Sequence, residues 1–315
     1  MSVTVAGMAS SHAYTFSEPS DWETRRKRTR ARYASKYGAE PPEAAGIANE
    51  TLEGNVERFK VISGGLERLK HEFEAFRPDV LIVVGDDQDE HYNEDIPQFA
   101  IYTGEGFVSL DRDTKGAEPA TYRSHPELAR HIYKDCVESG FDLVGTKKFP
   151  SDSLISHAHA QIVSYLKPTV PVVPVFVNAI HVPAPSPARC FGFGEALRGA
   201  LARFPGSLRV AVYASGGLSH FSAGFPYPSY SGPLGIGQIA EDFDHTLFDW
   251  MRDGANAKLG SLTSSQLLDN GEVELRQWII LMGVLGERKP DWLVYEAFYR
   301  GIMGMGVGFW GAFSV

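Results

Sequence analysis

The residues of this sequence best suited to chemistry are histidines that directly follow predicted strands. His220 comes after the apolar run 208–213 and a Ser-Gly-Gly turn, whose glycines let the backbone approach a ligand closely. His12 occupies the same kind of position after the short run 3–9. Ligands of open α/β sheets bind at the carboxyl ends of strands. Both imidazoles are therefore candidates for acid–base or metal chemistry, and the competing interpretation is a polar loop residue at each position.

An acidic segment follows the clearest strand of the sequence. Residues 78–85 form an apolar run without interruption, which predicts a central parallel strand buried on both faces. Residues 86–91 then supply four carboxylates, the amide of Gln88 and the imidazole of His91. Oxygen ligands with an added imidazole suit a hard or borderline divalent metal. The alternative is an acidic, solvated loop.

These groups together predict a metal centre. His12, the 86–91 segment and the Glu241-Asp242 pair could bring nitrogen and carboxylate ligands to one point. Two histidines and one carboxylate with open coordination positions suit a non-haem Fe(II) that acts on dioxygen. His157 and His220 would remain as acid–base groups outside the ligand set.

Composition limits the class of protein. The chain has 315 residues, 43% hydrophobic and 22% charged, which is ordinary for a globular protein. A net charge of −9 gives no electrostatic case for nucleic acid or an anionic membrane surface as partner. Two cysteines are too few for a disulfide framework. With no signal peptide and no run of 18 apolar residues, we expect a soluble cytoplasmic protein.

The alternation of predicted strands and helices indicates the architecture. We expect an α/β fold with one domain over residues 1–315, in which helices flank a central, mostly parallel sheet and the active site lies at the strand carboxyl ends. Residues 17–49 read as a helical elaboration, and their basic run 25–32 as a solvated helix face. Residues 224–237 form a Gly-, Pro- and Tyr-rich loop that we expect to act as a lid or wall.

Several segments together resemble a known family, the class III (LigB-type) extradiol ring-cleavage dioxygenases. The resemblance is greatest to the single-chain members that act on gallate, 3-O-methylgallate or protocatechuate-like catechols. The matching pieces, in family order, are Ser11-His12, residues 78–87, Ser156-His157-Ala158, residues 173–178, 185–190 and 215–220, Asp242-Phe243-Asp244, and Asn270-Gly271-Glu272 with residues 275–278.

The resemblance implies roles for individual residues. The first metal histidine falls on His12, and the two histidines that handle the catechol proton and dioxygen fall on His157 and His220. The second metal histidine falls on Gln88 in an ungapped match and on His91 if three residues are inserted. Ligand chemistry favours His91 and parsimony favours Gln88. The carboxylate ligand falls on Asp242, with Glu241 beside it as the alternative.

The activity that the resemblance implies is extradiol cleavage of a catecholic or gallate-like ring, with Fe(II) as cofactor and a small aromatic diol and dioxygen as substrates. The protein is also expected to form a homo-oligomer. The unusual residues at the second histidine and the carboxylate leave two alternatives open. One is a LigB-fold protein with an altered metal site and no catalysis. The other is a metal-assisted hydrolase in which the 86–91 carboxylates hold an ion that activates water.

Overall fold

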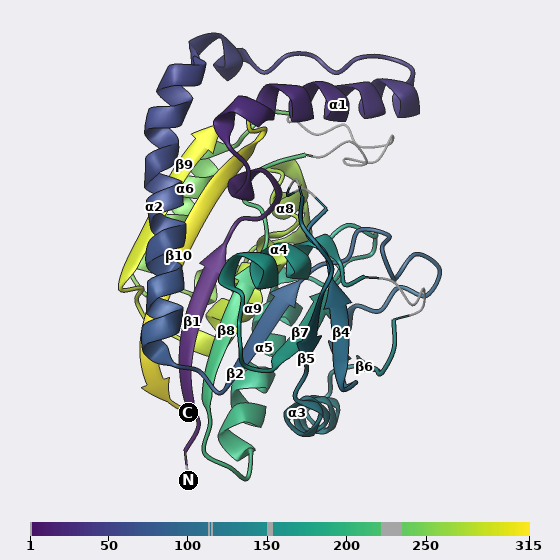
Figure 1. Cartoon of the computed structure of the whole chain (residues 1–315), viewed down its shortest axis with the longest axis vertical. Coiled ribbons are helices and arrows are strands. Elements are labelled where there is room, and N and C mark those ends of the chain that lie inside the picture. The colour runs from purple at the N-terminus through teal and green to yellow at the C-terminus, as the bar shows by residue number, and fades with distance from the viewer. Residues whose placement is uncertain (1, 113, 115, 150–153, 222–234) are drawn as a thin grey trace.

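The chain is described by a computed structural model that covers residues 2–112, 114, 116–149, 154–221 and 235–315. Most of the predicted loop 224–237 lies outside these residues. An eight-stranded sheet forms the centre (Figure 1). Its strands, in spatial order, are β6 (Leu143–Thr146), β3 (Phe99–Tyr102), β7 (Val172–Val177), β2 (Val80–Gly85), β8 (Arg209–Ser215), β1 (Thr4–Ser10), β10 (Met303–Ser314) and β9 (Trp292–Phe298).

The middle of the sheet is parallel. β7, β2, β8 and β1 run in one direction, whereas β10 and β9 add an antiparallel edge and β3 pairs antiparallel with β7. A separate hairpin joins β4 (Gly106–Ser109) to β5 (Ala120–Arg123). Every residue of β2 is buried, as its uninterrupted apolar run predicts. The predicted α/β class with a mostly parallel sheet is confirmed.

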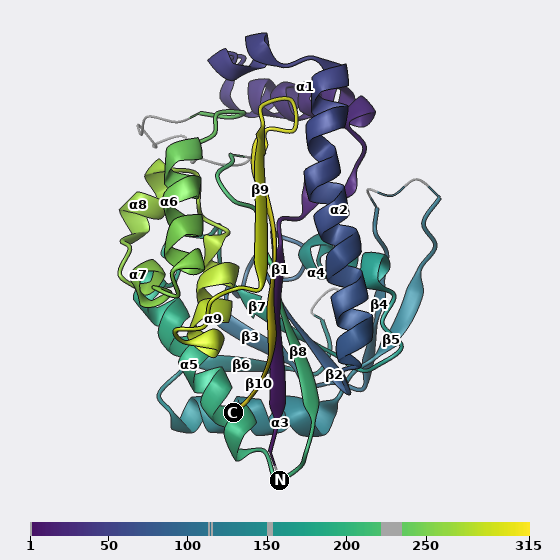
Figure 2. The ribbon, with the colours of Figure 1, turned by 90° about the vertical axis from the view of Figure 1, so that its left-hand side faces the viewer.

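Helices cover both faces of the sheet (Figure 2). Alternate residues of β2 face opposite sides: Leu81 and Val83 join the core beneath α2 (Leu52–Phe76) and α4 (His157–Leu166), and Ile82 and Val84 join the other core. That second core contains side chains of six helices of the described chain. These are α3 (Pro126–Glu138), α5 (Pro187–Arg203), α6 (Glu241–Arg252) and α9 (Leu275–Leu285), with the short α7 (Ala257–Gly260) and α8 (Ser264–Asp269).

Two glycines let α5 and α9 touch through their backbones. A Cβ at Gly194 would overlap the carbonyl oxygen of Ile280, and one at Gly283 would overlap the carbonyl oxygen of Phe191. All eleven residues of α9 are buried. This close approach fixes α9 along its length, and with it the residue at which the helix begins.

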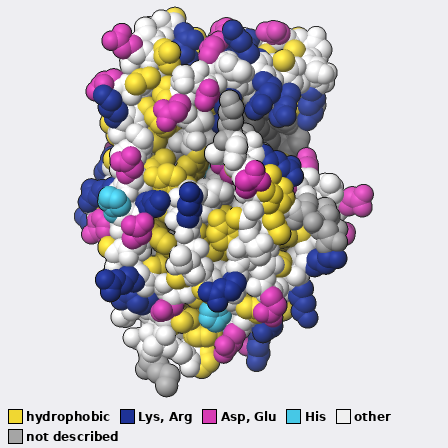
Figure 3. Space-filling model, in the orientation of Figure 1, with side chains coloured by type: hydrophobic (Ala, Val, Ile, Leu, Met, Phe, Trp, Pro, Cys, Tyr) yellow, Lys and Arg dark blue, Asp and Glu magenta, His cyan; other side chains and the backbone are white. Residues whose placement is uncertain are grey.

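The helix α1 (Pro19–Tyr37) lies across the end of the molecule toward which β1 points (Figure 1). Trp22 anchors it between the rings of Phe59 and Phe298. The predicted solvated basic face is only partly correct, because Arg26 is buried and pairs with Glu43 at 2.7 Å. Lys27, Arg28, Arg32 and Lys36 are exposed, whereas Arg25 and Arg30 are half-buried. Lys and Arg side chains gather at the end of the molecule where α1 lies in the space-filling view (Figure 3).

Two short 3₁₀ helices, η1 (Ala13–Phe16) and η2 (Ala45–Asn49), complete the described elements. Within the described ranges, no helix combines the length and apolar character that crossing a bilayer requires.

Candidate metal centre

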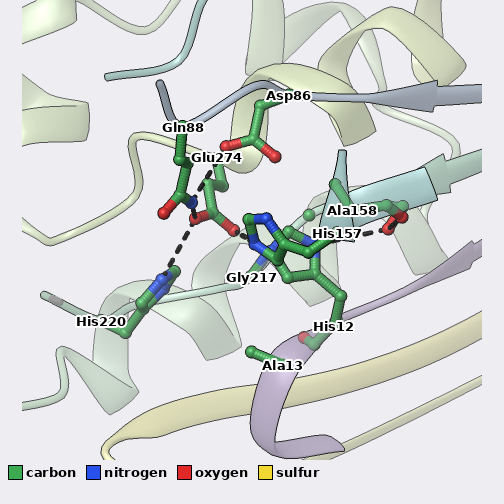
Figure 4. Close-up of polar contacts among 12 residues, drawn as sticks. His12, Ala13, Asp86, Gln88, His157, Ala158, Gly217, His220 and Glu274 are labelled. Atoms are coloured by element: carbon green, nitrogen blue, oxygen red, sulfur yellow. Dashed lines mark hydrogen bonds and ion pairs between the residues drawn. The ribbon is translucent and has the colours of Figure 1, made fainter. Parts of the chain in front are cut away.

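Three buried side chains converge where central strands end (Figure 4). His12 lies two residues after β1, Asp86 directly follows β2, and Glu274 is the residue before α9. One ring nitrogen of His12 and one oxygen of each carboxylate lie within 4.8 Å of one another. The three residues are at most 2% exposed. Among the described residues this is the group whose geometry could hold a metal ion.

Hydrogen bonding fixes the tautomer of His12. The Ser215 hydroxyl donates its single proton to the carbonyl oxygen of Ala158 at 2.7 Å, so at 3.3 Å it accepts from Nδ1–H of His12. The lone pair of Nε2 then faces Glu274. Burial, only partly opposed by Glu274, lowers the pKa of His12 to about 4, so the ring is neutral at neutral pH. A neutral imidazole with one nitrogen held by a hydrogen bond is the form that binds metals.

Three groups surround the Glu274 carboxylate besides His12. Gly217 N–H donates to Oε2 at 2.7 Å, the Gln88 amide donates to Oε1 at 2.8 Å, and Nε2 of His220 lies 3.3 Å from Oε1. Burial alone would raise the pKa of Glu274, but His12 and His220 hold it well below its usual range. The carboxylate is therefore ionised at neutral pH.

The arrangement of these groups fits a divalent cation. Nε2 of the neutral His12 and Oε2 of Glu274 lie 3.2 Å apart, and both present lone pairs with no proton between them. Asp86 adds a fully buried oxygen, Oδ1, which has no hydrogen-bond partner in the part of the chain that the structure describes. A cation among these three groups would satisfy all of them, since imidazole and carboxylates are ligands for first-row divalent metals.

The other acids of the 86–91 segment bind neighbouring groups of the protein. The Asp87 carboxylate accepts N–H donors from Glu90, His91 and Tyr92, each at 3.1 Å, and so closes the loop after β2. Asp89 lies on the surface and pairs with His181 at 3.1 Å. Glu90 binds His157 at 3.0 Å, so of the predicted cluster of carboxylates only Asp86 lies within the group that could hold a metal.

Of the two candidates for the second histidine position, the structure brings Gln88 to the centre and not His91. The Gln88 amide contacts Asp86 at 3.1 Å as well as Glu274. The His91 ring instead stacks on Phe149 at 4.1 Å and lies edge-on to Phe176, outside the group that could hold a metal. The three-residue insertion that favoured His91 is therefore not supported by the geometry, because the Asp87 turn carries that ring into an aromatic cluster.

Neither Asp242 nor Glu241, the two acids expected to supply the carboxylate ligand, lies within the group that could hold a metal. Asp242 lies exposed in the first turn of α6, and Glu241 beside it interacts with Tyr299. The inward acid of that turn is Asp244, which binds Tyr295 and the Ser219 N–H. The carboxylate beside His12 is Glu274. Glu274 lies between two pieces that resemble the family, Asn270-Gly271-Glu272 and residues 275–278, but belongs to neither of them.

His157 borders the same centre. Its ring lies edge-on to that of His12, with centroids 5.0 Å apart. Glu90 accepts both the backbone N–H of His157 at 2.8 Å and Nδ1–H at 3.0 Å, which leaves Nε2 for a substrate. Burial would lower the pKa of His157, but the Glu90 hydrogen bond and nearby carboxylates raise it to about 10.

His220 stands on the opposite side of Glu274 from His12 (Figure 4). Its Nδ1–H donates to the Leu218 carbonyl at 2.7 Å, and its backbone N–H to Gly271 at 2.9 Å. Burial lowers the pKa of His220, but Glu274 outweighs this and raises it to about 9. Without a metal both histidines are acids at neutral pH, and a nearby cation would lower the two pKa values.

Comparison with known proteins agrees with this arrangement. Residues 47–310 match the family model described as the catalytic LigB subunit of aromatic ring-opening dioxygenase. The match begins within η2, so it includes Gln88, His157, His220 and Glu274 but not His12.

Individual relatives are similar over shorter stretches. The chain is 35% identical to a gallate dioxygenase of Pseudomonas putida over 101 residues, which cover 30% of this chain and 28% of that protein. It is 29% identical to a 2,3-dihydroxyphenylpropionate/2,3-dihydroxicinnamic acid 1,2-dioxygenase of Klebsiella pneumoniae over 168 residues, 50% and 49% of the two chains. The chain thus spans half or less of the length of these relatives.

A solved structure, the uncharacterized protein JW3007 of Escherichia coli K12, is similar over 98% of this chain and 100% of that one. Its 12% identity and TM-score of 0.49 are too low to carry an argument.

Proposed function

Because the chain belongs to the LigB family of aromatic ring-opening dioxygenases, we propose that it opens the ring of a catecholic or gallate-like compound beside the diol, with Fe(II) and dioxygen. The observation that carries this proposal is the pair of acceptors formed by His12 Nε2 and Glu274 Oε2, which face each other at 3.2 Å. That pairing is consistent with a site built to hold a cation.

In this proposal His12 and Glu274 hold the metal together with one donor from the segment after β2, either Asp86 or Gln88. When bound, Fe(II) supplies the redox chemistry with dioxygen and an anchoring point for the diol. The protein contributes burial that excludes water and a fixed orientation of the ligands. Ser215 maintains the His12 tautomer, and Gly217 and Gln88 orient Glu274.

His157 and His220 are proposed to move protons. His157 holds its Nδ1 proton on Glu90, so Nε2 exchanges a proton with a diol hydroxyl or with oxygen. His220 holds its Nδ1 proton on the Leu218 carbonyl and likewise presents Nε2. With one nitrogen of each ring anchored, the two histidines can serve as base and acid on opposite sides of Glu274.

The relatives' names support a small aromatic diol as substrate, but they do not identify its substituents. The compounds in these names, gallate and 2,3-dihydroxyphenylpropionate, share a pair of adjacent hydroxyl groups and differ in their other ring substituents. The homo-oligomer expected from the sequence stays a prediction that a mass measurement in solution would check.

One observation favours the alternative of a metal-assisted hydrolase. Asp86 places a second carboxylate beside Glu274, and oxygen-rich sites commonly hold ions that activate water. Such an enzyme would need no dioxygen, which separates the two functions cleanly.

The test is oxygen consumption by the Fe(II)-loaded protein with a panel of catechol, protocatechuate, gallate and 3-O-methylgallate, alongside metal analysis. We expect uptake of dioxygen with at least one diol and none with the matching monophenol. Metal-loaded protein that hydrolyses esters or amides anaerobically and consumes no dioxygen would support the hydrolase. Loaded protein with neither activity would support the non-catalytic reading.

A further inference from the structure

Asp86 is an unusual residue for its surroundings. It is completely buried. Among the described residues its Oδ1 has no hydrogen-bond partner, and its other oxygen accepts from the Gln88 amide at 3.1 Å. An ionised carboxylate in such a place costs several kcal/mol unless it is paired with a cation. No Lys or Arg of the described chain pairs with it. The Glu274 carboxylate repels it, and the protonated ring of His157 offsets only part of that repulsion.

The position of Asp86 is fixed from both sides. Gly85, directly before it, packs against the His159 ring, and the Ser156 hydroxyl donates to the Asp86 carbonyl at 2.9 Å. His159 in turn is held by Ser156 and by the Val175 carbonyl at 3.0 Å. The backbone at Asp86 is therefore locked, and the side chain projects toward His12 and Glu274 (Figure 4).

The orientation of the Gln88 amide decides which residue can coordinate. Its neighbours are carboxylate oxygens of Asp86 and Glu274, and the ionised Glu274 can only accept. The amide nitrogen must therefore face the centre, so the amide oxygen, which is the atom that binds hard cations, faces away. Gln88 in this arrangement is a donor and not a ligand.

We propose that Asp86 is the third protein ligand of the metal, with His12 and Glu274, and that Gln88 is a positioning residue that orients the two carboxylates. This inference rests on the metal site of the proposed function. It assigns the ligand role at the second histidine position to a carboxylate two residues earlier, at the end of β2.

This ligand set has a chemical consequence. Two carboxylates and a neutral imidazole balance the charge of a divalent ion, whereas two imidazoles and one carboxylate would leave one positive charge. Carboxylate-rich sites also suit Mn(II), so Mn(II) is a suitable probe of binding together with Fe(II).

The experiment measures Mn(II) and Fe(II) affinity by anaerobic calorimetry on the metal-free protein, without substrate. Asp86→Asn keeps the shape of the side chain and removes its charge. Gln88→Leu removes the amide. Asp89→Asn is the matched control, because it makes the same charge change three residues away on an exposed side chain whose positive φ of 66° suits Asn.

We expect Asp86→Asn to weaken both metals more than about 100-fold, and Gln88→Leu by about 10–100-fold, the range typical of residues that orient ligands. Asp89→Asn should bind as the wild type does. Unchanged affinity in folded Asp86→Asn, or a larger loss in Gln88→Leu than in Asp86→Asn, would overturn the assignment.

A spectroscopic count on the wild type keeps the proposal testable even if a variant misfolds. Pulsed electron paramagnetic resonance of the Mn(II)-loaded protein should detect one coordinated imidazole nitrogen, from His12. Two such nitrogens would rule out Asp86 as the third ligand in favour of a histidine. Neither readout involves turnover, so absence of ring cleavage with intact metal binding would count against the proposed function alone.

Discussion

At the scale of residues, the molecule is organised around two hydrogen-bond acceptors that face each other. Ser215 holds the proton of His12 on Nδ1, and Gly217 and Gln88 hold Glu274 in place. Each neighbour removes an alternative orientation of one of the two groups. The result is a rigid opening for a cation between His12 and Glu274.

The first prediction compares two acids. Glu274→Gln should reduce bound iron to background, because it removes the charge that offsets the cation. Asp242→Asn should retain full iron, since Asp242 lies exposed on α6. Iron analysis after anaerobic loading measures both. Loss of iron from Asp242→Asn with retention in Glu274→Gln would restore the original assignment from sequence.

The second prediction concerns His157 and His220. Replacing either with phenylalanine should leave iron bound and lower the turnover rate by about 10²–10⁴-fold, as expected for loss of a general acid or base. Steady-state oxygen consumption and metal content, measured on the same sample, test the two parts together. A His220→Phe protein without iron would make His220 a ligand.

The third prediction follows from the Glu90–His157 contact. The pKa of His157 is raised to about 10, so in the metal-free protein this group stabilises the fold fully below its unfolded pKa near 6.5 and loses that effect as the pH rises through 10. Glu90→Gln weakens the contact. The free energy of unfolding of the variant should therefore fall less between about pH 7 and pH 10, by roughly 1–2 kcal/mol for this partly exposed ring.

Urea unfolding of chelator-treated protein at the two pH values measures this difference. Equal pH dependence in wild type and Glu90→Gln would show that Glu90 does not set the protonation of His157. Titration of the Glu90 carboxyl does not contribute to this difference, because its pKa is lowered from 4.5 and so lies below the pH range that is compared.

The sequence could predict the histidines better than the carboxylate. His12 and His220 follow apolar runs, so their place at strand ends is a local property, and the structure brings both beside Glu274. The identity of the carboxylate depends on which helix N-terminus reaches the strand ends, which is a matter of long-range packing. The helix dipole favours acids at and near any helix N-terminus, so the local pattern does not distinguish Asp242, in the first turn of α6, from Glu274, directly before α9.

At the scale of elements, the junction of α9 with α5 positions Glu274. Gly194 and Gly283 allow backbone contact between these helices, and α9 begins one residue after Glu274. The same helix end places Trp278, whose indole N–H donates to the Gly216 carbonyl at 2.9 Å. This bond and the bond from the Gly217 N–H to Glu274 connect the start of α9 to the turn before His220.

The fourth prediction tests this positioning. Gly283→Ala should destabilise the protein by about 1–3 kcal/mol, because the added methyl meets the Phe191 backbone and the helices must separate. Gly64→Ala in α2 is the control, since its Cβ would meet no atom within 4 Å. It should stabilise by about 0.5–1 kcal/mol. Thermal unfolding distinguishes the expected loss of stability from the expected gain. Unchanged stability in Gly283→Ala would contradict the packing of α5 against α9.

The order of elements was predictable where propensity and pattern agree. The buried parallel strand β2 follows directly from its apolar run. The sequence did not predict that 303–314 is a strand, because Gly304, Gly306 and Gly308 are unfavourable in strands. A Cβ at these positions would meet Asp244, Phe248 and Leu293 respectively. The glycines are therefore explained by side chains distant in the sequence, which a local pattern does not reveal.

At the scale of the whole molecule, metal binding and folding should be coupled. The centre draws ligands from the ends of β1 and β2 and from the start of α9, which lie far apart in the chain. An ion that binds only the folded state therefore stabilises the entire domain.

The fifth prediction states this coupling as a number. Metal at about 100 times its dissociation constant should add roughly 2.7 kcal/mol to the free energy of unfolding, and a chelator should remove that increment. Chemical unfolding with Mn(II) and after chelation measures it. Glu274→Gln should show no difference between the two conditions.

The proposed ring cleavage is tested most directly by following isotopically labelled dioxygen into the product. Fe(II)-loaded protein is incubated with the diol that supports the fastest oxygen uptake, and the product is analysed by mass spectrometry. We expect wild type and Asp242→Asn to form a ring-opened product that carries both labelled oxygen atoms, and Glu274→Gln to form none. Iron-loaded wild type that leaves the ring intact, or a product labelled equally by Glu274→Gln, would contradict it.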